Sequence, residues 1–315
     1  MSKKSMAERR QAQSAPRGPG GRGGNGRGQT LRSGPQYRRQ KSSARRPWGL
    51  FAAIGAVVAV FVVVILIAEL TAAPTGQDTQ VLPAPASVVR VITHLSTANL
   101  TKVGKGTVNF PPRAVPSPTN LTSGGKPEVL YIGGEYCPYC ALERWTLVGA
   151  LSRFGSFAHL KIIRGSATDS AGLNIATFTF AHGVTYTSRY ISFVGRELYS
   201  NVPDSKSSNG YAPFQSLTAA EASLFTNLGQ GGFPFVDFGG KVAQVGSEST
   251  SPGPPALEGY DWQQIANLLT KPSSTPAKMI LGGVNYDTAA ICLMTGNRPG
   301  SVCGQPLIRQ LESGL

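Results

Sequence analysis

The feature that most constrains the fold of this chain is a pair of cysteines placed between an apolar strand and a helix. The run Val129–Ile132 is short and apolar, which predicts a buried strand. Two glycines follow it, then Cys137-Pro138-Tyr139-Cys140, and beyond Cys140 apolar residues recur at three- and four-residue spacings. The sequence therefore predicts a strand, a tight turn, and a helix that begins at Cys137.

This position gives the two cysteines a defined chemistry. The first N–H groups of a helix have no partners and carry positive partial charge, so a thiolate at Cys137 is stabilised and its pKa is lowered. Pro138 suits an early helical position, where its missing N–H costs nothing. Cys140 lies about one turn further on, within reach of a disulfide. We therefore predict that Cys137 attacks and that Cys140 resolves the mixed disulfide.

A second landmark lies about a hundred residues downstream. Pro234 enters the apolar run 235–238, which ends in two glycines, and Val242–Val245 is a suitable return strand. A proline opening a strand lacks a donor and fits the first position of that strand. The sequence predicts a hairpin that starts at Pro234.

These two landmarks resemble the thioredoxin fold, in which a cis-proline before a central strand faces the helix of a Cys-x-x-Cys pair. The resemblance implies that Pro234 is this cis-proline and that the backbone of Phe233 binds the substrate chain beside Cys137. The run 125–155 is also similar to a family of membrane-anchored thioredoxin-like proteins from actinobacteria and archaea, catalogued as a domain of unknown function. The likeness covers the chain from residue 85 onward.

The expected fold class is α/β: a thioredoxin-like fold with an inserted β-hairpin region and a C-terminal helical extension, preceded by one transmembrane helix and a disordered N-terminal tail. Residues 160–165 predict the next strand, parallel to the first. The resemblance implies an insertion, because Cys137 and Pro234 are 97 positions apart, about twice what a bare thioredoxin domain needs. Two β-rich alternating runs within it, 175–180 and 186–194, predict an inserted hairpin or strand pair.

Four helices are predicted besides the one at Cys137. Helical patterns cover 85–103, 260–269 and 286–295, and a Thr-x-x-Glu capping box at Thr218 opens a helix over 219–228.

The net charge of +14 is confined to one end of the chain. Residues 1–47 hold 13 of the 30 Lys and Arg and one of the 16 acidic residues, so the remainder is nearly neutral. This tail has little apolar content, which predicts disorder. Its Gly/Arg run 20–28 leaves RNA or lipid-headgroup binding as an alternative, but we expect a solvated tail and no nucleic-acid partner.

Residues 48–70 predict a transmembrane helix, because 47–68 carry no charge and two arginines precede them. The expected domains are a cytoplasmic tail (1–47), this span, a linker (71–84) and an extracytoplasmic domain (85–315), giving a single-pass protein of the cell membrane whose contacts include the lipid bilayer. A cleaved signal peptide is the alternative.

All four cysteines follow the predicted span, in a compartment expected to be oxidising. We choose Cys137–Cys140 as the redox pair and Cys292–Cys303 as a structural disulfide. Zinc is the competing use and would need both pairs to converge, so we predict no metal and no cofactor.

The other candidates near the motif are weaker. Tyr136 and Tyr139 are predicted to line a substrate groove, whereas Trp145 is interpreted as core. Glu135 is interpreted as a proton relay or a solvated turn residue. Thioredoxin-like domains commonly hold a carboxylate six residues before the first cysteine, and here that residue is Tyr131.

Five further polar residues carry no specific prediction. Glu143 and Arg144 are as compatible with a helix surface as with a functional role. The three histidines show no ligand spacing and are interpreted as ordinary residues: His94, His159 and His182.

The predicted function is thiol–disulfide exchange on secreted or envelope proteins, with oxidase or isomerase activity favoured over reductase. The expected partners are extracytoplasmic protein thiols and disulfides and a membrane redox partner. The hypothesis from another class is a non-catalytic envelope scaffold or peptide-binding module with the same frame.

Overall fold

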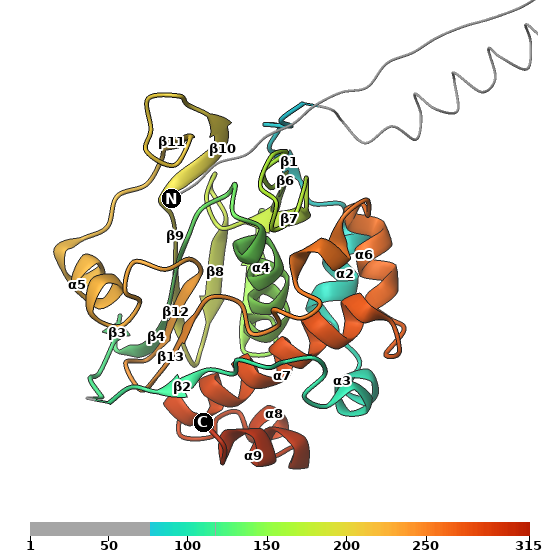
Figure 1. Cartoon of the computed structure of the whole chain (residues 1–315). Coiled ribbons are helices and arrows are strands. Elements are labelled where there is room, and N and C mark those ends of the chain that lie inside the picture. Colours follow the sequence, from blue (N-terminus) through green and yellow to red (C-terminus); the bar gives the residue numbers. More distant parts are fainter. Residues whose placement is uncertain (1–75, 117) are drawn as a thin grey trace, which may run out of the picture. The chain divides into compact units, whose positions relative to one another are not determined.

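The computed structural model describes residues 76–116 and 118–315, which form a mixed α/β structure with several sheets (Figure 1). At its centre is strand β4, Lys126–Gly133, whose apolar run is predicted by the sequence. Strand β9 (Ser192–Glu197) pairs with β4 in parallel, and β12 (Phe235–Phe238) pairs with it antiparallel on the other side. Strand β13 (Val242–Val245) continues the sheet beyond β12.

Alternation along β4 sends its side chains to two different cores. Val129 and Tyr131 belong to the main core, while Leu130 and Ile132 form a second, smaller core on the opposite face of the sheet. Helix α4 (Pro138–Leu151) lies over the first face, and α5 (Ala219–Asn227) covers the second (Figure 1).

Helix α4 is buried on nearly all sides because other helices cover the side that turns away from the sheet. Its largest helical contact is with the long helix α7, Thr275–Met294. Further helices complete this layer and the C-terminal end: α2 (Ala86–Thr93), α3 (Thr97–Val103), the 3-10 helix η1 (Pro254–Leu257), α6 (Trp262–Leu269), α8 (Gly300–Cys303) and α9 (Pro306–Glu312).

The remaining strands are short. Two of them extend the central sheet: β2 (Arg113–Ala114) on β13 and β3 (Thr122–Ser123) on β4. The others form three separate antiparallel groups: β1 (Leu82–Pro83), β6 (Lys161–Arg164) and β7 (Ala176–Thr179); β5 (Gly155–Ala158) with β8 (Thr185–Ser188); and β10 (Tyr199–Pro203) with β11 (Tyr211–Pro213).

Several sequence predictions are confirmed. The hairpin after Pro234 exists, with Phe235 paired to Val245 and Phe238 to Val242. The capping box at Thr218 opens α5. The Thr218 side chain accepts a hydrogen bond from Glu221 N, and the Glu221 carboxylate accepts one from the Thr218 N–H.

The prediction that the run 160–165 pairs in parallel with the first strand is wrong. The run 160–165 forms β6, which belongs to the three-stranded sheet with β1 and β7, and β9 is the parallel neighbour of β4. The two runs read as an inserted hairpin do not pair with each other either. Instead, 175–180 supplies β7, and 186–194 is split between β8 and β9 because the chain turns at 189–191. Alternation predicted strands correctly, but it carries no information about partners.

Two helix predictions need new boundaries. The pattern 85–103 is two helices, because Ser96 caps a second one with its side chain. The helix predicted over 286–295 begins at Thr275, and its first half was missed because it contains a proline and two glycines. Residues 77–84, expected to be linker, contact the domain through β1 and through Gln77, whose side chain bonds Gly165 O and Ala167 N.

The structure does not support the prediction of a single-pass membrane protein. Within residues 76–116 and 118–315, no helix combines the length and the apolar character needed to cross a membrane. The predicted tail (1–47) and span (48–70) lie outside the described residues. For the described residues the structure supports a mixed α/β fold with several sheets, and it gives no support to the expected membrane localisation and lipid contacts.

Candidate functional site

The two cysteines lie where β4 passes into α4. Cys137 caps α4 in an extended conformation, and its Sγ accepts a hydrogen bond of 3.3 Å from Cys140 N. Gly133 makes this close turn possible, because a Cβ at that position would lie 2.2 Å from Tyr131 Oη and 3.0 Å from Cys140 Sγ. The glycines after the strand therefore let the chain pass directly over the thiol of Cys140.

Both cysteines are free thiols, and their environments separate their acidities. Hydrogen bonds from the Cys140 side chain and N–H lower the pKa of Cys137, assisted by the charge of Arg144 and opposed by burial. Burial raises the pKa of Cys140 well above its ordinary value, and its interaction with Cys137 adds to the rise. Cys137 keeps 6% of its surface exposed, whereas Cys140 has none. Cys137 is therefore the more acidic thiol and the one of the two residues that retains some exposed surface.

Arg144 makes the side-chain hydrogen bonds that hold the turn before Cys137. It is fully buried and reaches back along α4, where Nη1 donates to Tyr131 Oη at 3.0 Å and to Gly134 O at 3.2 Å, and Nη2 donates to Glu135 O at 3.2 Å. The guanidinium thus holds the turn that carries Cys137 and places a fixed positive charge under it.

Glu197 at the end of β9 is the counter-ion of Arg144. One carboxyl oxygen lies 3.1 Å from Arg144 Nη1, and both side chains are fully buried. The parallel register places Glu197 beside Gly133. Burial raises the pKa of Glu197 to about 7, even though Arg144 lowers it. A buried carboxyl group therefore lies beside the start of the cysteine turn, although position 131 carries none.

A second polar pair flanks the turn. Glu135 is buried, and its Oε1 accepts a hydrogen bond of 2.6 Å from Thr179 Oγ1 and lies 3.0 Å from His182 Nε2. The imidazole of His182 stacks on Phe214 at a centroid distance of 5.0 Å. Glu135 is thus held in place by partners, and it is not a solvated turn residue.

The proline landmark lies next to the cysteine turn. The Phe233–Pro234 peptide bond is cis. Phe235 pairs with Ile132, so Pro234 is aligned with Gly133, and Phe233 comes within 3.7 Å of the Cβ position of Gly134. The structure therefore brings Pro234 and Phe233 beside the cysteine turn, as the resemblance requires.

An aromatic cluster surrounds this turn. Tyr136 stacks in parallel on Tyr211 at 4.3 Å between ring centroids and meets Tyr199 edge-on at 6.3 Å. Tyr199 contacts Phe233 edge-on at 6.4 Å. Two of these rings come from the β10–β11 hairpin, and Glu135 N donates to Tyr199 O, which ties the hairpin to the turn. Tyr139, the other predicted groove residue, is half-buried against the main core.

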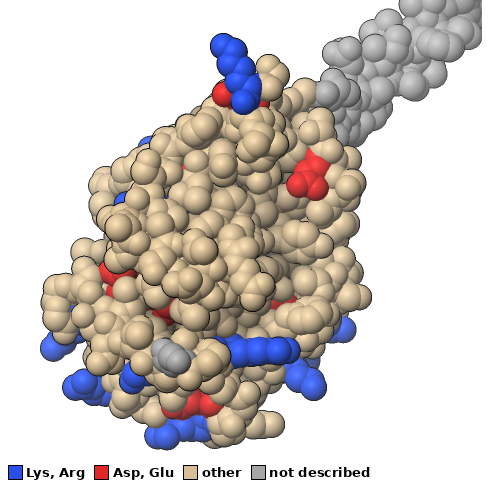
Figure 2. Space-filling view, turned by 60° about the vertical axis from the view of Figure 1, so that its left-hand side comes forward, with Lys and Arg blue, Asp and Glu red and all other residues tan. Residues whose placement is uncertain are grey.

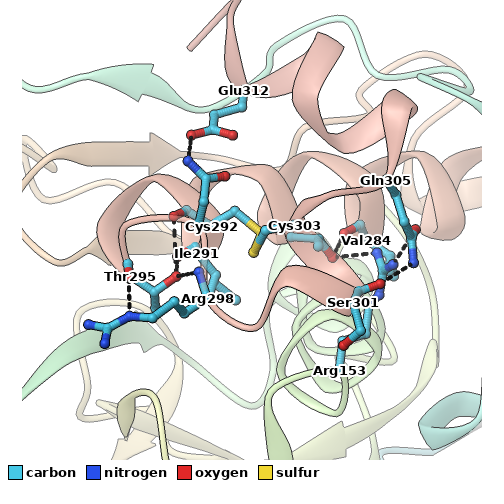
Figure 3. Close-up of a disulfide and its surroundings, with 12 residues drawn as sticks. Arg153, Val284, Ile291, Cys292, Thr295, Arg298, Ser301, Cys303, Gln305 and Glu312 are labelled. Carbon is cyan, nitrogen blue, oxygen red and sulfur yellow. Dashed lines mark hydrogen bonds between the residues drawn. A yellow bond between two sulfur atoms is a disulfide. The ribbon is translucent and has the colours of Figure 1, made fainter.

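The second cysteine pair is far from this site in the fold. Cys292 and Cys303 form a disulfide between the end of α7 and α8, with a Cα–Cα distance of 5.5 Å (Figure 3). Nearby, Arg153 donates to Thr288 Oγ1 at 3.0 Å and to Gln305 Oε1 at 2.8 Å. These contacts link the C-terminal helices to the end of α4.

Sequence reasoning missed several participants of the site. Arg144 could have been found, because spacings of seven and four residues place it on the same helical face as Cys137 and Cys140. Glu197 could not, since its role depends on which strand pairs with β4. His182 had been interpreted as ordinary, and Tyr199 belongs to a strand that the sequence did not indicate. Trp145 is core, as expected, with its Nε1 donating to Ala176 O.

Comparison with known proteins gives a partial placement. A family model described as a domain of unknown function (DUF929) matches residues 114–204, which include the cysteine pair, β4 and β9. No curated protein and no solved structure matches the chain. These comparisons thus support only the expectation that part of the chain is similar to a domain catalogued as of unknown function, and they give no support for a thioredoxin-fold oxidoreductase.

Proposed function

We propose that this protein is a thioredoxin-like thiol–disulfide oxidoreductase that uses Cys137 and Cys140. The observation that carries the proposal is the position of Cys137 at the N-cap of α4, with its sulfur bonded to the N–H of a second free cysteine and a buried arginine below it. An acidic, partly open thiol next to a buried partner is the arrangement that disulfide exchange needs.

The central sheet supports the thioredoxin-like part of the proposal. Its order is β9-β4-β12-β13, with β9 parallel to β4 and the other two antiparallel to their neighbours. The Cys-x-x-Cys helix follows β4, and the cis-proline precedes β12. The cysteine pair at the start of α4 and the cis-proline before β12 are the two landmarks on which the resemblance rests, and their positions support the proposal.

The mechanism follows from the different acidities of the two thiols. In the reducing direction the Cys137 thiolate attacks one sulfur of a substrate disulfide, which forms a mixed disulfide and releases the other substrate sulfur as a thiolate. Cys140 then loses its proton and attacks Cys137 Sγ, which releases the second substrate thiol and leaves a Cys137–Cys140 disulfide. Glu197 pairs in register with Gly133, whose Cβ position lies 3.0 Å from Cys140 Sγ, and its pKa is about 7, so it is the group that we propose accepts the proton of Cys140.

We propose that the reaction runs as disulfide donation or isomerisation. The hydrogen bonds of Cys140 and the charge of Arg144 favour the Cys137 thiolate, and both act in the reduced protein. Stabilising the reduced form raises the reduction potential of a Cys-x-x-Cys pair, so the disulfide form is the better donor.

The surroundings of Cys137 favour a polypeptide substrate. The ring of Phe233, next to the cis-proline, borders the turn, and the rings of Tyr136 and Tyr199 add apolar surface. The face that carries α5 and the β10–β11 hairpin shows few charged side chains across its centre (Figure 2). An extended chain with apolar side chains around its cysteine fits such a surface.

A trapping experiment with the full chain tests the proposal. Cys140→Ser removes the resolving thiol, so the mixed disulfide with Cys137 should accumulate as adducts that reducing agents release. Cys137→Ser/Cys140→Ser is the matched control and should form none. If Cys140→Ser forms no adduct with an unfolded disulfide-bonded protein, Cys137 is not a working nucleophile and the non-catalytic module becomes the better interpretation.

A further inference from the structure

Three carboxyl groups meet in the interior on the side of α4 that faces α7. Glu143 comes from α4, Glu248 from the loop after β13, and Asp287 from the middle of α7. One oxygen of each lies within 4.8 Å of the others, and all three residues are at most 2% exposed. Three elements that are distant in the sequence therefore point acidic side chains at one place.

Five oxygens of these groups have no hydrogen-bond donor among the described residues other than one another's carboxyl groups. They are Glu143 Oε1 and Oε2, Asp287 Oδ1 and Oδ2, and Glu248 Oε1. The buried Glu197 differs, because Arg144 compensates it. Among the ion pairs of the described residues, none includes a member of the cluster. A buried carboxylate without a partner costs several kcal/mol, so this group needs protons or a cation.

Gly283 gives the cluster its space. A Cβ at this position of α7 would lie 2.7 Å from Glu248 Oε2 and 3.0 Å from Thr146 Oγ1. Any larger residue at this point of the α4–α7 contact would displace the carboxyl group or the hydroxyl group.

We propose that Glu143, Glu248 and Asp287 bind one divalent cation, and that this cation is Ca²⁺. Three carboxylates offer up to six hard oxygen ligands, and Ca²⁺ takes six to eight at about 2.3–2.6 Å. Two ligand oxygens on opposite sides of one Ca²⁺ are about 4.6–5.2 Å apart, which is twice the bond length. The carboxyl oxygens lie within 4.8 Å of one another, so one ion can contact all three groups. Mg²⁺ fits less well, because it prefers shorter octahedral bonds and retains several waters.

The cation compensates the acidic cluster and joins α4, α7 and the loop 246–253, so it stabilises the frame behind the cysteine site. This role differs from the sequence-based expectation of no metal, which considered only cysteines and histidines. It is independent of the redox proposal, since none of the three side chains contacts Cys137 or Cys140 through a hydrogen bond of the described structure.

The test compares metal content and thermal unfolding of the full chain. Protein refolded in EGTA and then given excess Ca²⁺ should retain one Ca²⁺ per chain after gel filtration, measured by elemental analysis. At a hundredfold excess over Kd its Tm should rise by about 5–10 °C. Glu143→Gln/Asp287→Asn should lose both effects, while Glu258→Gln, which changes an exposed carboxylate, should keep them.

Two results would overturn the proposal. If the unmodified chain retains no Ca²⁺ and its Tm does not change, the cluster consists of carboxylic acids that share protons. If the double variant retains Ca²⁺ and shifts like the unmodified chain, the ion binds elsewhere. Should the double variant not fold, Glu143→Gln alone serves for this comparison, and the measurement on the unmodified chain stands by itself.

Discussion

Replacing Arg144 with methionine tests the hydrogen bonds and the ion pair that hold the turn before Cys137. The substitution keeps a long side chain but removes the donors to Tyr131 Oη, Gly134 O and Glu135 O, and it leaves Glu197 without its counter-ion. Breaking a buried ion pair by removing one partner costs about 3–5 kcal/mol of unfolding free energy. We expect a loss of this size for Arg144→Met near neutral pH.

The loss should depend on pH through Glu197. Its pKa is raised to about 7 in the folded state, so the folded protein binds the proton more tightly than the unfolded chain. This contribution to stability is present at low pH and is lost as pH rises toward 7. Arg144 lowers the pKa of Glu197, so this pKa is higher still in Arg144→Met. In that variant the stabilising contribution of Glu197 continues to fall above pH 7. Arg144→Met should therefore cost more at pH 8 than at pH 5.

Urea unfolding of four proteins at pH 5 and pH 8 measures this effect: the unmodified chain, Arg144→Met, Glu197→Gln and the double variant. The double variant should be more stable than Arg144→Met at pH 8, because no buried charge is left unpaired. In Arg144→Met the Cys137 thiol should also react more slowly with iodoacetamide at neutral pH, since its pKa rises. An equal loss at both pH values, with no recovery in the double variant, would refute this reasoning.

Three further predictions concern the frame around the site. Gly240→Ala should destabilise the protein by more than Gly246→Ala, for which a loss of roughly 1 kcal/mol is expected. Both glycines have positive φ, but only at Gly240 would the Cβ meet a backbone oxygen, at 2.4 Å. Chemical denaturation compares the two variants, and equal losses of unfolding free energy would contradict the close contact. Burial raises the pKa of Asp237 to about 6, so the contribution of this residue to stability falls as pH rises toward 6. Asp237→Asn should therefore be at least as stable as the unmodified chain at pH 8 in the same assay. If the variant loses more unfolding free energy at pH 8 than at pH 5, the predicted direction of the pH dependence is wrong. Replacing Cys292 and Cys303 with alanine should lower the unfolding free energy by about 2–3 kcal/mol, measured under non-reducing conditions, and an unchanged value would mean that the cross-link does not constrain the unfolded chain.

The sequence predicted the parts of the fold that depend on local chemistry. The strand before the cysteines, the helix that Cys137 caps, and the hairpin after Pro234 all follow from turn residues, capping and alternation, which act over a few neighbours. The capping box at Thr218 was accurate for the same reason.

The sequence failed where strand partners are chosen by packing. The run 160–165 has the composition of a buried strand, but β1 and β7 pair with it, and β9 takes the place beside β4. Glu197 became visible as a site residue only with that pairing. The carboxyl cluster was missed for a similar reason, since Glu143, Glu248 and Asp287 share no spacing in the sequence.

A redox titration of the Cys137–Cys140 pair tests the central claim most directly. The full chain is equilibrated with glutathione at a series of reduced-to-oxidised ratios, and the fraction of disulfide is measured by alkylation and peptide mass. The proposed function predicts a reversible two-electron transition at a potential above about −270 mV, the value of thioredoxin. If no Cys137–Cys140 disulfide forms even in oxidised glutathione, the two thiols do not exchange, and the proposed function is wrong.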